Sequence, residues 1–233
     1  FSTFAFQNST NLEHIESLWK TNSLLISFPW EKARENRRHC IYGAEFAIDC
    51  AISSEDENWF EHAKQRLYVD FDKYLSSGED RRDEPFWWPV ALKYHCLKSE
   101  SSSSSLTKKD AKELLNKANK VAREGPLPVR TRANYWMARL SRVLELSDGI
   151  EYFAELESYV ESDEYPKSDV YGALLYVHLI DLEQRFGFES EHNFTELFNA
   201  ALADSNESTR LHFSRFLQNN DTSIIDSLCF NYL

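Results

Sequence analysis

The stretch Thr107–Leu146, TKKDAKELLNKANKVAREGPLPVRTRANYWMARLSRVLEL, decides the fold class of this chain. Its first half repeats small and branched apolar residues at helical spacing from Ala111 to Ala122, behind a threonine suited to a helix N-cap. Gly125 and Pro126 then form a helix stop signal. The second half resumes the helical period with Ala133, Trp136, Met137, Leu140 and Leu144. The stretch therefore predicts two consecutive helices joined by a tight turn.

The same pairing of helices recurs along the chain on both sides of this stretch. Predicted pairs begin near Pro85, Pro128, Pro166 and Asn206, at spacings of 43, 38 and 40 residues. No segment shows the alternation of apolar and polar residues that indicates a strand. A period of about 40 residues is typical of stacked helical hairpins.

We therefore expect an all-α protein in two parts. Residues 85–233 are predicted to form a right-handed αα-hairpin solenoid. The pattern before Pro85 is less regular, so residues 1–84 are predicted to be irregular N-terminal helices that either cap the solenoid or form their own subdomain.

Composition favours a globular chain with a large helical core. Hydrophobic residues make up 42% and charged residues 27%, while glycine and proline number only 6 each, fewer than β-rich folds spend on turns. No stretch approaches the roughly 18 consecutive apolar residues of a membrane span, and residues 1–10 lack the pattern of a signal peptide. We therefore expect no membrane association.

The cysteines favour a reducing compartment. None of the four lies in a Cys-x-x-Cys pair, and they form no framework of a small secreted fold. Their positions are Cys40, Cys50, Cys96 and Cys229. We therefore expect reduced core thiols in a cytoplasmic or nuclear protein.

Charge is distributed unevenly along the chain. The formal net charge of −12 argues against nucleic-acid binding by the whole surface. Residues 106–142, however, hold ten basic and three acidic side chains, giving +7 and leaving −19 for the rest. An acidic chain with one basic band indicates a localised electrostatic surface.

Basic residues recur on the predicted helical hairpin of this band. Tyr135 and three arginines fall at helical positions expected opposite the apolar stripe of the second helix, and lysines recur similarly on the first helix. The candidate partner-binding residues are Lys109, Lys112, Arg132, Tyr135, Arg139 and Arg142. They are expected either to line a groove for a carboxylate-rich peptide or a phosphate backbone, or to be an ordinary solvated face.

The helical pairs resemble the tetratricopeptide and half-a-tetratricopeptide superfamily. The pattern Ala111-x-x-Leu114-Leu115-x-x-Ala118, echoed by Phe194-x-x-Leu197-Phe198-x-Ala200-Ala201, is similar to the small-residue packing of those repeats. No repeat carries the complete Trp-Leu-Gly-Tyr set of the family. The resemblance implies a scaffold that binds peptides or partner subunits and has no chemistry of its own.

One motif points to an enzyme instead. Arg34 and His39 form an Arg-x4-His pair that resembles the motif of the helical HEPN ribonucleases. A histidine of near-neutral pKa beside a cation suits phosphoryl transfer. A solvated basic turn on a long helix explains the same residues, and Arg185 with His192 also matches the looser spacing.

Metal and cofactor sites are not expected from the sequence. The pairs at His39 and Cys40 and at His95 and Cys96 are sequence neighbours, which point to different faces of a helix. His178 lies within an apolar stripe and is expected to be a core histidine. No glycine-rich phosphate loop is present.

The sequence thus predicts a non-enzymatic helical-repeat scaffold that binds a protein or acidic peptide, as a subunit of a larger complex. Two alternatives remain open. The first is a HEPN-type ribonuclease using Arg34 and His39, and the second is an RNA-processing helical-repeat subunit that contacts RNA through the basic band.

Overall fold

The predicted all-α class is confirmed wherever the structure is described. The computed structural model describes residues 41, 44, 45, 47, 48, 51, 57–70, 85–101, 106–163, 165, 170–205, 207, 209, 210 and 213. Every regular element among them is a helix, and these residues contain no β-strand. Within the same residues, no helix is both long enough and apolar enough to cross a bilayer. The right-handed solenoid arrangement stays a prediction.

The chain divides into two compact units, Phe1–Ser104 and Ser105–Leu233. The sequence placed a boundary between residues 84 and 85, ahead of the helix that starts near Pro85. The observed division falls after that helix, which belongs to the first unit.

Aromatic side chains hold together the described part of the first unit. Its elements are α4 (Glu57–Lys64), the π-helix η2 (Gln65–Asp70) and α6 (Trp87–Ser101). Phe60 of α4 meets Tyr94 of α6 edge-on at 6.2 Å between ring centroids. Tyr68 of η2 contacts the Trp87 ring at 5.9 Å, and its hydroxyl forms a hydrogen bond with Nε2 of His95. Such edge-to-face pairs add to the burial of large rings.

The second unit contains five described helices. They are α7 (Lys108–Glu124), α8 (Leu127–Val143), α9 (Gly149–Glu161), α10 (Val170–Phe186) and α11 (Phe194–Asp204). The predicted hairpin of Thr107–Leu146 is present as α7 and α8, which pack against each other. Asn193 caps α11 by accepting a hydrogen bond from the backbone N–H of Glu196 at 3.2 Å.

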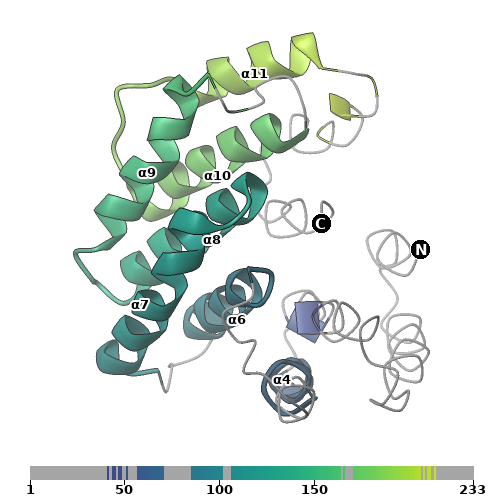
Figure 1. Ribbon diagram of the computed structural model, residues 1–233, viewed down its shortest axis with the longest axis vertical. Coiled ribbons are helices and arrows are strands. Elements are labelled where there is room, and N and C mark those ends of the chain that lie inside the picture. The colour runs from purple at the N-terminus through teal and green to yellow at the C-terminus, as the bar shows by residue number, and fades with distance from the viewer. Residues whose placement is uncertain are drawn as a thin grey trace. The chain divides into compact units, whose positions relative to one another are not determined.

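Helices α8 and α10 form the centre of the second unit. Helix α8 packs against α7, α9 and α10, and α10 packs against α8, α9 and α11 (Figure 1). Every residue of α8 from position 131 to 141 is buried, and so is every residue of α10 from 172 to 182. A helix enclosed on all sides has no solvated face on which polar side chains lie by default.

Helix α7 is an outer helix with one buried face. Its buried residues are Ala111, Leu115, Ala118, Val121 and Ala122, which recur every three or four positions. Thr107 caps its start, with Oγ1 accepting a hydrogen bond from the backbone N–H of Asp110 at 3.1 Å. The remaining positions of α7 are mostly exposed and charged.

Gly125 is needed at the end of α7 because of space and not because of an unusual backbone angle. Its φ of −68° and ψ of 167° are accessible to any residue. A Cβ at this position, however, would lie only 2.6 Å from the carbonyl oxygen of Val121. The backbone N–H of Gly125 also donates to that oxygen at 2.9 Å, so the close approach is part of the cap.

Replacing Gly125 with Ala should destabilise the protein by about 1–3 kcal/mol, because the new methyl group must displace a hydrogen-bonded backbone carbonyl. Urea unfolding would measure the change. Glu124→Ala, at the exposed neighbouring position, is the control and should alter the free energy of unfolding by no more than about 0.5 kcal/mol. Equal stability of the two variants would contradict this role of Gly125.

Candidate functional site

Three of the four residues of the predicted row on α8 do not face solvent. The exposed fractions of Arg132, Tyr135 and Arg139 are 5%, 0% and 1%. The expectation that they lie on a free face opposite the apolar stripe is therefore wrong. The reason is that α10 packs on α8, so the side of α8 that a two-helix hairpin leaves open is covered.

Tyr135 and Arg139 instead take part in a polar cluster between α8 and α10, which is buried except at Arg185. The Tyr135 hydroxyl donates to Oδ2 of Asp181 at 2.7 Å, and Nη1 of Arg139 donates to the Tyr135 oxygen at 2.9 Å. Arg185 donates two hydrogen bonds to the same carboxylate. Nε donates to Oδ1, and Nη2 donates to Oδ2 at 2.9 Å. We call Tyr135, Arg139, Asp181 and Arg185 the α8–α10 cluster.

The buried carboxylate of the α8–α10 cluster is compensated by the two arginines beside it. Asp181 has no exposed surface, and this burial raises the pKa of its carboxyl, while Arg185, Arg139 and the Tyr135 hydroxyl act in the opposite direction. Burial lowers the pKa of Arg185, but its hydrogen bond and attraction to Asp181 outweigh that effect and hold it above the usual range. A fork-shaped guanidinium on a carboxylate is a strong form of ion pair.

Aromatic rings surround the cations of the α8–α10 cluster. The guanidinium of Arg139 lies 4.8 Å from the Trp136 ring centroid and 5.0 Å from that of Phe186. Arg185 lies 5.4 Å from the Phe186 centroid. Contact with ring faces stabilises the Arg139 cation in particular, because its burial has removed most of its water.

His178 extends the packing of the cluster and is a core histidine, as predicted. Its ring is 3% exposed and stacks on Tyr135 at 4.2 Å between centroids, with 13° between the planes. Burial, and then the charge of Arg132, lower the pKa of His178 to about 3. The neutral imidazole is therefore the form that fits the folded core near neutral pH.

Arg142, the last member of the predicted row, caps a neighbouring helix. Its side chain is exposed, and Nε donates to the carbonyl oxygen of Phe186 at 2.7 Å, with Nη2 3.3 Å from the carbonyl oxygen of Gly187. Gly187 follows α10 with a φ of +66°, the left-handed conformation common after a helix. Arg142 thus satisfies terminal carbonyls and complements the negative end of the α10 dipole.

The α8–α10 cluster is suited to holding helices together and not to chemistry on a dissolved substrate. Tyr135 and Asp181 have no exposed surface, and Arg139 has almost none. A general acid or base must come within hydrogen-bonding distance of its substrate. The hydrogen bonds of Tyr135 and Asp181 across the two helices are made inside the fold, away from solvent.

The predicted lysines of α7, in contrast, are exposed. Lys109 and Lys112 project from its solvent face, together with Lys120. Elsewhere on the helix, Lys117 pairs with Glu113 at 2.8 Å and Lys108 with Glu145 at 3.6 Å. Within the described part of the chain, Lys112 and Lys120 form no ion pair.

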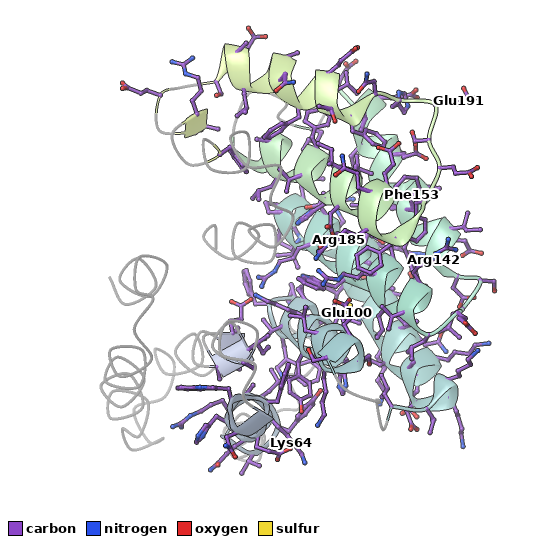
Figure 2. All side chains as sticks on the ribbon, turned by 180° about the vertical axis from the view of Figure 1, so that it is seen from behind. Lys64, Glu100, Arg142, Phe153, Arg185 and Glu191 are labelled. Atoms are coloured by element: carbon purple, nitrogen blue, oxygen red, sulfur yellow. The ribbon has the colours of Figure 1, made fainter. Side chains whose placement is uncertain are left out.

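A second surface feature is an acidic hollow of about 500 Å³ between α9 and the loop before α11. It is lined by Glu157, Ser158, Glu161, Glu189, Ser190, Glu191 and His192. Ser190 donates a hydrogen bond to the Glu157 carboxylate, and Nε2 of His192 lies 3.7 Å from Glu161. Figure 2 shows Glu191 on this loop, apart from Arg142 and Arg185.

The sequence did not single out this hollow. The loop at Glu189–His192 is distant in the chain from α9 and meets it only through folding. Among the described residues, no group of three or more His, Cys, Asp or Glu side chains is arranged to hold a metal ion.

The structure describes only one of the two Arg–His pairs found in the sequence. Arg34 and His39 lie outside the described residues. Arg185 and His192 have separate partners, Asp181 for the arginine and Glu161 for the histidine.

No protein-family model, curated protein or solved structure matches this chain.

Replacing Tyr135 with Phe should lower the free energy of unfolding by about 1–3 kcal/mol. The change keeps the ring but deletes the hydroxyl that joins Arg139 to Asp181, so two hydrogen bonds are lost at a buried site. Denaturant unfolding of the full chain measures the loss. Tyr152→Phe, at a half-buried tyrosine of α9, is a matched control, and a similar loss in both variants would contradict the bridging role.

Replacing His178 with Phe should make folding less sensitive to acid. When folding lowers the pKa of a histidine, the unfolded chain binds a proton more readily than the folded chain. The free energy of unfolding is therefore undiminished above the unfolded pKa of about 6.5 and decreases as the pH falls below it. With the native pKa of His178 at about 3, the loss between pH 7 and pH 5 is about 2 kcal/mol. Urea unfolding at both pH values would measure it.

The variant should lack that share of the acid sensitivity but retain the share from His95, whose pKa burial lowers to about 4. An identical loss of stability between the two pH values in both proteins would show that His178 is not responsible.

Proposed function

We propose that this chain is a non-enzymatic helical-repeat scaffold that binds an acidic protein partner through the exposed face of α7. The observation that carries this proposal is the set of solvent-exposed cations on a helix whose other face is fixed in the core. Lys112 and Lys120 have no ion-pairing partner in the described part of the chain, so their charge is available to a ligand.

The charge distribution of the chain favours an acidic protein over a nucleic acid as the ligand of α7. The formal net charge of the chain is −12, which repels a nucleic-acid backbone outside the immediate surroundings of α7. A protein segment carrying a few carboxylates can meet α7 without bringing a long row of negative charges near the acidic remainder. Charge complementarity of this kind mainly sets specificity and association rate.

The rigidity of α7 supports a role in presentation. Its five buried residues are at most 5% exposed, and Thr107 caps its first turn. A helix held in this way already has an ordered backbone, so less conformational freedom of the backbone is lost when a partner binds.

An RNA-processing helical-repeat subunit is the second candidate, because the same exposed lysines can contact phosphates. The HEPN ribonuclease hypothesis stays a prediction from Arg34 and His39 alone, since both lie outside the described residues.

The test compares two charge-reversed proteins in affinity capture from lysate of the native source. Lys112→Glu with Lys120→Glu alters the unpaired cations of α7, whereas Lys108→Glu with Lys117→Glu changes the net charge equally at lysines already paired with Glu145 and Glu113. Each capture is run with and without nuclease, and thermal unfolding checks that both variants fold.

The expected result is a protein partner that survives nuclease treatment, is retained by the second pair of changes, and is reduced about tenfold by the first pair. Recovery that depends on RNA would favour the RNA-processing candidate. Equal recovery by both variants would exclude the exposed face of α7 as the binding surface.

A further inference from the structure

The exposed cations of α7 are not spread evenly around the helix. At 3.6 residues per turn, Lys109, Lys112, Lys120 and Arg123 fall within an arc of about 80°. Asn116 lies inside the same arc, and all five side chains are exposed. We call these five residues the basic stripe of α7.

The acidic residues of α7 are kept on the adjoining flank. Asp110, Glu113 and Glu124 fall within a separate arc of about 60°, which also contains Lys117. The Lys117–Glu113 ion pair at 2.8 Å lies on this flank. No carboxylate of α7 falls within the arc of the basic stripe, although Glu113 borders it and Lys117 and, more weakly, Lys109 lower the pKa of that carboxyl.

Within the basic stripe the cations form two pairs. Lys109 and Lys112 are three residues apart, as are Lys120 and Arg123, and uncharged Asn116 lies between the pairs. At 1.5 Å rise per residue, the members of each pair are about 4.5 Å apart along the axis, and the stripe spans about 21 Å.

We infer that the basic stripe receives an acidic α-helix of a partner protein, with two carboxylate pairs whose spacing matches the two cation pairs. This inference rests on the proposed function and specifies its partner. On a helix aligned with α7, glutamates at positions i, i+3, i+11 and i+14 share one face and repeat the axial spacing of the stripe.

The spacing distinguishes a helix from other acidic ligands. Side chains on one face of an extended strand recur about every 6.6 Å, so a strand cannot present adjacent carboxylates at about 4.5 Å. The gap at Asn116 leaves about 12 Å between the pairs without a cation, whereas a nucleic-acid backbone is evenly charged along its length.

The acidic flank limits how a partner helix can be rotated about its axis on α7. A partner helix rotated toward Asp110, Glu113 and Glu124 brings like charges together, which disfavours the wrong docking position. The stripe attracts and the flank repels, so one rotational setting of the acidic helix on α7 is preferred.

The experiment measures binding of the full chain to labelled probes by fluorescence anisotropy at low salt. The first probe is an alanine-based helical peptide with glutamates at positions i, i+3, i+11 and i+14. The second has the same composition, with the four glutamates distributed around the helix. The third is a single-stranded RNA oligonucleotide that carries four phosphate charges.

We expect the patterned peptide to bind at least about tenfold more tightly than the other two probes, and to weaken as salt is added. The paired changes Lys112→Glu and Lys120→Glu should abolish the preference. The control pair Lys108→Glu and Lys117→Glu should preserve it, because those residues lie outside the basic stripe.

Equal binding of both peptides would overturn the matched-spacing inference while leaving α7 as an acidic-partner surface. Preference for RNA would overturn it in favour of a nucleic-acid ligand. If no probe binds but the lysate partner still depends on Lys112 and Lys120, the inference fails and the proposed function stands. If that dependence is also absent, both fail.

Discussion

The carboxylate of Asp181 is the constraint on which the arrangement of the second unit depends. A buried charge is tolerated only when it is paired and hydrogen-bonded, and Asp181 is satisfied by groups from two helices. Arg185 comes from its own helix, whereas the Tyr135 hydroxyl comes from α8. Sliding α10 along α8 separates Tyr135 from Asp181, so the cluster favours one register of the two central helices.

The packing of α8 on α10 at the centre determines which faces of the other helices are exposed. Helices α7, α9 and α11 pack on this pair and leave their outer faces in solvent. The basic stripe is therefore displayed on α7, and the acidic hollow forms where the loop before α11 meets α9. Arg142, at the end of α8, donates a hydrogen bond to the last carbonyl of α10. A residue that was expected to bind a partner therefore stabilises the packing of two helices.

Much of the helical content could be predicted from local signals. The period of small and apolar residues in α7, the break at Gly125 and the apolar surroundings of His178 each depend on a few neighbouring residues. For the candidate site, exposure was correctly expected for Lys109, Lys112 and Arg142 but not for Arg132, Tyr135 and Arg139. Those three were misplaced because a polar residue opposite an apolar stripe faces solvent only if nothing else covers it.

The sequence by itself determined that the described elements are helices, where α7 ends, and that α7 concentrates cations along one face. Helix period and stop residues act within a few positions, so no distant partner is needed to predict them. Only the tertiary structure decided which polar residues are buried. Tyr135 and Asp181 are separated by 46 positions, and their hydrogen bond exists only because α10 returns to cover α8. The same long-range packing brings the loop before α11 against α9 and creates the acidic hollow, which local sequence patterns do not predict.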